Sequence, residues 1–207
     1  MPAEKLGYYL YYDEPLDLNN LRDKDSFGIE TLPVNTASSL TGWAYSYRWA
    51  GCTHITTPPV LPATNLSGGF YRHMFDGCTS LTSTPDLSKV TSVAVYTYWF
   101  MFAGCTSLTH VTELPNPVYE HCYESMFENC TSLTSGPELN ANLRRINISG
   151  CFGVYKRMFK GCTSLTQAPN LPSEHVPENA YYQMFEGCTS LVNPPIISGT
   201  FFKDWSC

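Results

Sequence analysis

The stretch MFAGCTSLTHVTEL, residues 101–114, decides the fold, because close copies of it recur along the chain. A diverged copy begins at Arg48, and the other complete copies begin at Met74, Met126, Met158 and Met184. Each copy carries one cysteine at the same place: Cys52, Cys78, Cys105, Cys130, Cys162 and Cys188. The cysteines are 25 to 32 residues apart, a period typical of solenoids built from stacked repeats.

Further positions repeat in step with the cysteine. Seven residues before each cysteine stands a repeat tyrosine: Tyr45, Tyr71, Tyr98, Tyr123, Tyr155 and Tyr181. In the five complete copies Met and Phe follow it at i+3 and i+4, which predicts a short helix with one apolar face. Gly comes next in most copies, where a helix must end in a left-handed residue. The β-branched C-T-S-L-T run then predicts a short strand that a proline ends.

No single copy can bury its own apolar face, so we expect the copies to stack with their strands in a parallel sheet. The expected fold class is an α/β repeat, a leucine-rich-repeat solenoid with short parallel strands, short helices and six clear repeats. We divide the chain into an N-terminal cap or docking segment with one degenerate repeat (1–40), the solenoid (41–199) and a C-terminal aromatic tail (200–207).

Composition excludes several classes of protein. The chain has 207 residues and a formal net charge of −6, and only 14% of its residues are charged. An acidic balance without basic clusters argues against a nucleic-acid partner. No stretch approaches the roughly 20 apolar residues of a membrane span, and no secretory signal is visible in this chain.

The copies, with the pattern MFxGCTSLTxxPxLP, resemble BspA-type leucine-rich repeats, and among them the variant of Bacteroidetes surface proteins. Similar arrays occur in phages of those bacteria. The resemblance extends over about residues 41–199. It implies a right-handed solenoid used for adhesion and recognition at surfaces, and it implies no catalytic residues.

The chain contains nine cysteines, which raises the question of disulfides or a metal site. Equivalent side chains on neighbouring repeats point the same way, whereas a disulfide needs its Cβ atoms to converge. Metal sites usually show short CxxC pairs, and none occurs here. We therefore interpret the six repeat cysteines as small, buried structural residues with weak S–H donors, and we expect no metal and no other cofactor.

Positions that vary between copies are the candidates for binding. Next to the repeat tyrosines, the variable positions hold the aromatic residues Tyr47, Trp99, Phe100 and Tyr182. Exposed aromatics suit sugar or protein contacts, but packing between adjacent helices is an equal alternative. On the strand side, the candidates are His110 and Gln167. The ends offer candidate docking residues: Tyr8, Tyr9, Tyr11, Tyr12, Phe201, Phe202 and Trp205.

These features favour a non-enzymatic recognition or attachment module with protein or glycan partners, and an assembly as a homo-oligomer or within a larger particle. We favour a structural component of a phage virion, as a surface, decoration or fibre protein. The alternative is a fragment of a bacterial cell-surface adhesin. Both place the protein on a virion or an extracellular surface. A distant third hypothesis is a glycoside hydrolase that uses carboxylates of the column Asp86, Glu113 and Glu138.

Overall fold

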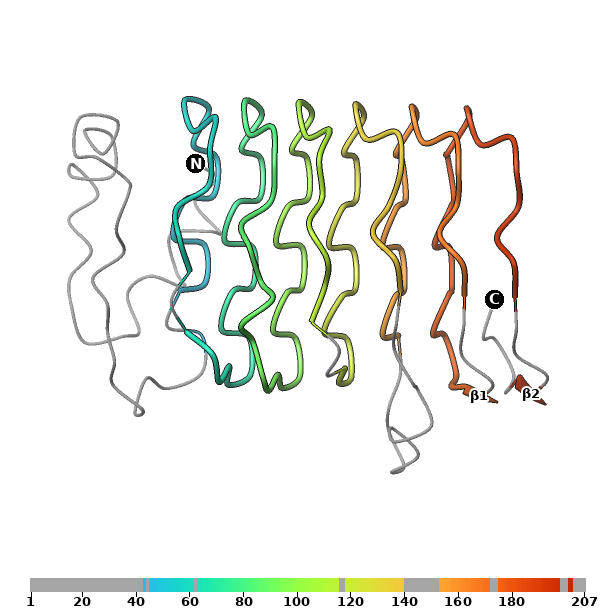
Figure 1. The fold of residues 1–207 in the computed structure, drawn as a ribbon, viewed down its shortest axis with the longest axis horizontal. Coiled ribbons are helices and arrows are strands. Elements are labelled where there is room, and N and C mark those ends of the chain that lie inside the picture. The colour runs from blue at the N-terminus through green and yellow to red at the C-terminus, as the bar shows by residue number, and fades with distance from the viewer. Residues whose placement is uncertain are drawn as a thin grey trace.

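A computed structural model describes residues 43, 45–61, 63–115, 118–139, 153–171, 175–197 and 201–202. The predictions for Tyr8, Tyr9, Tyr11, Tyr12 and Trp205 lie outside these residues. The repeats form successive rungs that stand side by side along one axis (Figure 1). We number the rungs 1 to 6 by their cysteines, from Cys52 in rung 1 to Cys188 in rung 6.

Each rung begins with a turn segment around its repeat tyrosine, in which two kinds of hydrogen bond alternate. In rung 2, the N–H of Met74 donates to the carbonyl of Tyr71 three residues earlier (3.2 Å), whereas the N–H of Tyr71 donates to Thr97 on rung 3 (2.9 Å). The next amide to cross between rungs is that of His73, which donates to Trp99 (2.8 Å). The segment is therefore a chain of tight turns, each tied to the following rung.

The short helices expected here are not formed, since the described residues contain no helix. The second residue after every repeat tyrosine has a φ between 51° and 58°: Tyr47, His73, Phe100, Ser125, Arg157 and Gln183. An α-helix needs a φ near −63° throughout. Tyr, Met and Phe still share the inner side, but successive turns bring them there, because every second amide bonds to the neighbouring rung instead of to its own segment.

The expected strands are reduced to single parallel bridges, such as Ser83 to His110 and Gln167 to Asn193. The C-T-S-L run forms another turn, in which the N–H of Leu81 donates to the carbonyl of Cys78 (3.1 Å). Regular pairing occurs only between β1 (His175–Val176) and β2 (Phe201–Phe202), which are parallel, among the residues that the structure describes. The C-T-S-L turn and the proline that follows it in most copies are so close in sequence that too few residues remain between them for a longer strand.

The core consists of columns of equal side chains that run along the axis. The repeat phenylalanines stack almost parallel from Phe75 to Phe185, with ring centroids 5.4 to 5.8 Å apart. The tyrosines from Tyr71 to Tyr181 also stack at 5.3 to 6.1 Å, with the rings of Tyr71 and Tyr98 inclined by 27°. Full burial of one such side chain contributes about 1.5–3 kcal/mol. No helix long and apolar enough to cross a membrane occurs in the described part of the chain.

Candidate binding surface

Each turn segment carries residues that differ between rungs, and we call the surface formed by these residues the turn face. Three columns define it. Two residues before the repeat tyrosines stand Trp43, Gly69, Tyr96, His121, Gly153 and Asn179. One residue after them stand Ser46, Arg72, Trp99, Glu124, Lys156 and Tyr182. Two residues after them stand Tyr47, His73, Phe100, Ser125, Arg157 and Gln183.

On rungs 1 to 3 the turn face is mainly aromatic. The imidazole of His73 lies between Tyr47 (4.5 Å, 7°) and Phe100 (4.8 Å, 3°), so three flat groups of one column stack along the axis. Tyr96, also on rung 3, stacks in the same manner on His121 of rung 4 (5.0 Å, 4°). Side chains held on both faces lose little further freedom when a ligand binds.

A cation lies within this aromatic region. The guanidinium carbon of Arg72 is 4.9 Å from the ring centroid of Trp43 and 4.2 Å from that of Trp99, and it is 5.8 Å from the ring of Tyr47. The three residues Trp43, Arg72 and Trp99 come from three successive rungs. We call Trp43, Tyr47, Arg72, His73, Tyr96, Trp99 and Phe100 together the aromatic half of the turn face.

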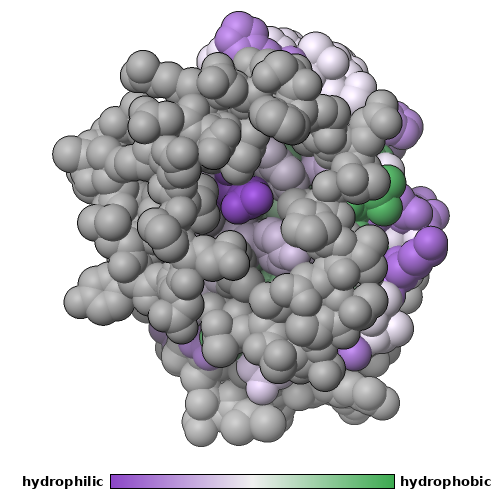
Figure 2. All heavy atoms as spheres, turned by 90° about the vertical axis from the view of Figure 1, so that its left-hand side faces the viewer, coloured by the Kyte–Doolittle hydropathy of each residue, from purple (hydrophilic) through white to green (hydrophobic). Residues whose placement is uncertain are grey.

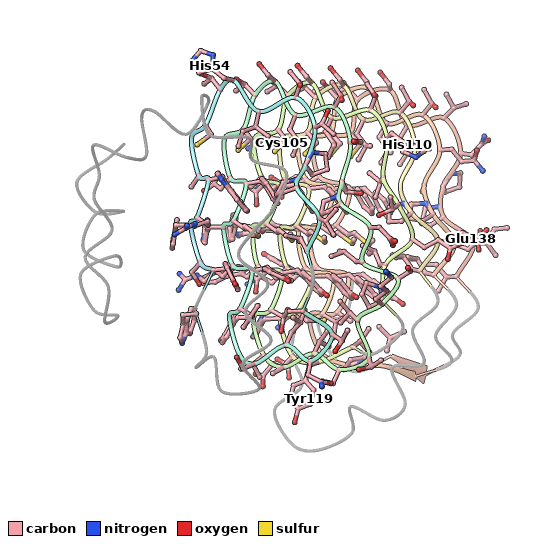
Figure 3. The ribbon with its side chains drawn as sticks, turned by 60° about the vertical axis from the view of Figure 1, so that its left-hand side comes forward. His54, Cys105, His110, Tyr119 and Glu138 are labelled. Carbon is pink, nitrogen blue, oxygen red and sulfur yellow. The ribbon has the colours of Figure 1, made fainter. Side chains whose placement is uncertain are left out.

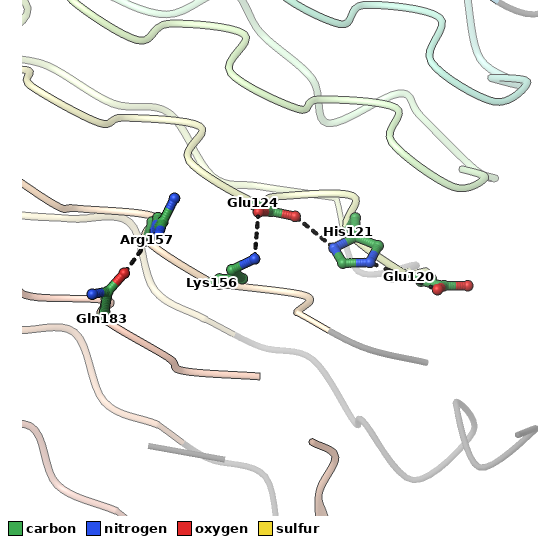
Figure 4. Close-up of polar contacts among 6 residues, drawn as sticks. All are labelled: Glu120, His121, Glu124, Lys156, Arg157 and Gln183. Carbon is green, nitrogen blue, oxygen red and sulfur yellow. Dashed lines mark hydrogen bonds and ion pairs between the residues drawn. The ribbon is translucent and has the colours of Figure 1, made fainter. Parts of the chain in front are cut away.

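On rungs 4 to 6 the turn face is mainly polar, with charged side chains on rungs 4 and 5 (Figure 4). The Glu124 carboxylate accepts a hydrogen bond from Nδ1 of His121 (2.5 Å) and pairs with Nζ of Lys156 on rung 5 (3.2 Å). Burial alone would raise the pKa of Glu124, which is 7% exposed, but the hydrogen bond and charge of His121 and the charge of Lys156 hold that pKa below its ordinary value. Farther along, Nε of Arg157 donates to the side-chain oxygen of Gln183 (2.7 Å).

The cysteine column lies inside the molecule, as Cys105 does in Figure 3. Each thiol from rung 2 onward donates to a backbone carbonyl of the rung before it at 3.1 Å; for Cys105 the acceptor is Phe75. All seven cysteines in the described residues are free thiols, and Cys122 is among the buried ones. No group of three or more His, Cys, Asp or Glu in the described ranges is arranged to hold a metal ion.

A second variable surface follows the bridges after the cysteines. His110 and Gln167 are exposed there, beside a threonine on each of rungs 1 to 5. The hydroxyl of Thr82 donates to the carbonyl of Thr56 on rung 1 (3.0 Å). The hydroxyls of Thr109 and Thr166 likewise donate to backbone carbonyls of the preceding rung. His110 and Gln167 are therefore the larger side chains on this surface that could contact a partner.

The carboxylates considered for hydrolysis are exposed and separate from the turn face. Figure 3 shows Glu138 at the outer edge of the solenoid, pointing away from it. Asp86 accepts a hydrogen bond from the backbone N–H of Ser88 (2.8 Å), which lowers the pKa of its carboxyl group. A glycosidase acid needs the opposite shift, a pKa raised towards neutrality.

Some predicted binding residues are more enclosed than the sequence indicates. Tyr47 is buried, at 6% exposed, whereas Trp99, Phe100 and Tyr182 are half-buried. Sequence reasoning missed Trp43 and Arg72. The available signal was their spacing, because Arg72 and Trp99 occupy one column on consecutive repeats, and Trp43 stands two residues before the tyrosine of the repeat that precedes them.

The ends differ from the middle of the solenoid. On rung 6, Val192 and Ile196 are 77% and 67% exposed, and they stand where most other rungs carry Thr and an acidic residue or Asn. Phe201 and Phe202 form β2 beside β1. Figure 2 shows the opposite end of the solenoid, on the side of rung 1. The described residues along its rim are largely hydrophilic, with one hydrophobic patch.

The repeat region is similar to a known family of repeats. Residues 69–201 match the model of the BspA type leucine rich repeat region, in six copies. Among solved structures, a leucine rich cell surface protein from Faecalibacterium prausnitzii A2-165 is 28% identical, with a TM-score of 0.38, over 70% of this chain and 32% of its own. The leucine rich repeat protein of T. pallidum is 17% identical, with a TM-score of 0.41, over 79% of this chain and 65% of its own.

The chain thus spans about a third of the length of the first of these proteins and just under two thirds of the second. No protein of curated function matches it.

Proposed function

The chain belongs to the BspA-type leucine-rich repeat family, and we propose that it is a non-enzymatic recognition module that acts at a surface through its turn face. One observation carries this proposal. The residues common to the repeats are used for packing and turns, whereas three columns of residues that differ between repeats lie together on the turn face. Recognition must be specific to a partner, so it depends on the residues that differ.

The scaffold under the turn face supports this role. In rung 5, the amides of Tyr155, Arg157 and Phe159 donate to carbonyls of rung 6 at 2.9 to 3.0 Å. Such bonds hold the backbone beneath the variable side chains before a partner arrives. A surface already in its bound conformation avoids part of the entropy loss of association.

We propose proteins and glycans as the partner classes. The setting that we favour is the surface of a phage virion, where the chain would be a decoration or fibre component, and a bacterial surface adhesin fragment is the second candidate. Detection of the chain in purified virions or in a cell-surface fraction, with specific antibodies, separates these settings. The ends, including Phe201 and Phe202, are a further candidate contact within such an assembly.

A hydrolytic function receives less support. Asp86 and Glu113 are exposed, and the lowered pKa of Asp86 does not suit a general acid at neutral pH. The double variant Asp86→Asn, Glu113→Gln should leave the behaviour of the protein towards any glycan unchanged. Hydrolysis of a glycan by the original chain, abolished in this variant, would reverse the order of the hypotheses.

The experiment for the main proposal is a glycan array probed with the full chain, together with mass measurement by size-exclusion chromatography with light scattering. Trp99→Ala changes the turn face, and His110→Ala is the matched change on the exposed second surface. We expect Trp99→Ala to abolish binding and His110→Ala to retain it, with both variants folded by circular dichroism. The reverse result would move the recognition surface to the side of His110 and Gln167.

A further inference from the structure

We infer that the exposed edge of rung 6 binds a second copy of this chain, so that two copies pair end to end about a two-fold axis. Rung 6 stands last in the row of rungs in Figure 1. The inference goes beyond the recognition role of the turn face, because it concerns a different surface. We call that surface the rung 6 edge and define it by the side chains of Phe185, Leu191, Val192, Asn193, Ile196 and Ile197.

The backbone of the rung 6 edge has hydrogen-bond donors without acceptors. On each of rungs 1 to 5, the amides two, four and six residues after the repeat tyrosine donate to carbonyls of the following rung, as Phe159 does to Met184 (3.0 Å). The equivalent amides of rung 6 have no acceptor among the residues that the structure describes: Gln183, Phe185 and Gly187. Such an unpaired row is a template on which another chain can dock.

The core is uncovered at the same edge. Phe159 of rung 5 is fully buried, whereas Phe185 of rung 6 is half-buried. Ile197 is 45% exposed, although Leu171 at the same position of rung 5 is 3% exposed. At the other end the core of rung 1 is enclosed, since Trp49 is 5% exposed. Of the two end rungs that the structure describes, rung 6 therefore offers the open core, and a closed pair uses one such surface twice.

Two apolar side chains on rung 6 do not follow from its place at the end of the row. Val192 stands where rungs 1 to 5 all carry threonine, and Ile196 stands where rungs 2 to 5 carry Asp, Glu or Asn. They are 77% and 67% exposed. Adjoining apolar side chains of this kind mark surfaces that a partner covers. The replacements therefore extend the uncovered core into a wider apolar surface.

Charge favours a second copy as the partner. The side chains of the rung 6 edge are uncharged, and the nearby carboxylate of Glu186 pairs with Nζ of Lys160 in its own chain (2.8 Å). Two chains that each carry a formal net charge of −6 can therefore meet here without burying unpaired charges of the same sign.

The hydrogen-bonding groups of the edge are also self-complementary. Its turn segment presents the unpaired amides, and its opposite side presents an acceptor. The carbonyl of Thr166 accepts the N–H of Val192 (3.2 Å), whereas the equivalent carbonyl of Val192 has no donor among the described residues. The exposed amide group of Asn193 lies beside it in the sequence. A two-fold axis that sets the turn segment of one copy against the opposite side of the other brings donors to acceptors in both directions.

The extent of the edge suits a specific pair. Successive repeats are 25 to 32 residues apart, so each copy would present the end of one rung of about this length. A standard stable interface takes about 20–30 residues from each partner. One rung end against another therefore has the size of an ordinary dimer contact.

The test is sedimentation velocity of the full chain at increasing concentrations. We expect the mass to rise from 23.2 kDa to twice this value and no further. The double variant Val192→Thr, Ile196→Asp gives rung 6 residues that inner rungs carry at the same positions, so it should fold, as circular dichroism can verify. It should pair at least roughly tenfold more weakly, because pairing would now bury a carboxylate.

The matched control is Val60→Asp. Val60 stands in the column of Ile196 but on rung 1, and it is 73% exposed, so its replacement should leave pairing unchanged. Trp99→Ala, which tests recognition by the turn face, should also pair like the original chain. Loss of ligand binding and loss of pairing are therefore read independently of each other.

Three outcomes would overturn the inference. The first is a monomer at every concentration, and the second is undiminished pairing in the folded double variant. The third is growth of the mass beyond two copies that Val60→Asp weakens, which would mean that copies stack head to tail between rung 6 and rung 1. None of these outcomes would affect the proposed role of the turn face.

Discussion

The thiol of Cys105 donates a hydrogen bond to the backbone carbonyl of Phe75 on the preceding rung, with a sulfur–oxygen distance of 3.1 Å. The same carbonyl accepts the N–H of Cys78 within its own turn (3.0 Å). One carbonyl therefore closes the turn of its rung and joins it to the next rung. The cysteine is small enough to be enclosed and polar enough to use the second lone pair of the oxygen.

Replacement of Cys105 by alanine should lower the free energy of unfolding by about 1–2 kcal/mol, since it removes a buried donor and leaves a small cavity. Cys188→Ala is the matched control, because its thiol makes a bond of the same length to Phe159 but is only half-buried. Urea unfolding followed by circular dichroism should show a smaller loss for Cys188→Ala. Equal losses would mean that enclosure of the thiol does not matter.

The glycine column predicts a second pair of stability changes. Gly51 and Gly161 have φ values of 76° and 74°, so alanine at either costs about 1–2 kcal/mol of left-handed strain. A Cβ at Gly51 meets nothing within 4 Å, whereas one at Gly161 overlaps the side-chain oxygen of Asn129. Gly161→Ala should therefore be the more destabilising change by thermal unfolding.

A double-variant cycle tests the cause of that difference. Asn129→Gly introduces the glycine that every other copy carries at this position, and it removes the overlapping side chain. In that background Gly161→Ala should destabilise no more than Gly51→Ala does. An undiminished effect would show that Asn129 does not cause the extra loss.

The family and the repeated architecture were predictable from sequence, and the family model confirms both. The replacement of the expected helices by turns could not be predicted, because the spacing of Tyr71, Met74 and Phe75 suits a helix and a chain of turns equally well. What separates the two is the positive φ at residues such as His73 and Phe100. The conformational preference of a single residue does not indicate this positive φ, because hydrogen bonds to the next rung stabilise it.

The candidate surface was predictable in part for a similar reason. Trp99 is an aromatic residue at a variable position, and both facts are visible when the copies are aligned. The contact of Arg72 with Trp43 joins different columns of two rungs. Such a contact depends on how the turns and inter-rung hydrogen bonds place neighbouring rungs, which no single copy encodes.

Thiol reactivity provides a third prediction. Burial raises the pKa of Cys162 to about 12, so at pH 8 only roughly one molecule in ten thousand carries the reactive thiolate. Burial also raises the pKa of Cys188, but this thiol is half-buried and more accessible. Peptide mapping by mass spectrometry after brief treatment with iodoacetamide should find Cys188 modified and Cys162 intact. Modification of both at one rate would contradict the structure, and urea should make both reactive.

The pair of Glu124 with His121 and Lys156 predicts how acid affects stability. Burial raises the pKa of Glu124, but the hydrogen bond from His121 and the nearby charges hold it below its ordinary value. A depressed carboxyl pKa contributes stability above the unfolded-state pKa of about 4.3, and the contribution is lost as the pH falls through the lower, folded-state value. Glu124→Gln should therefore lower the melting temperature at pH 7, and by much less once the pH falls below the folded-state pKa of this carboxyl group. The exposed Glu113→Gln should change it little at either pH, and a pH-independent loss in Glu124→Gln would show that packing, not charge, is what Glu124 supplies.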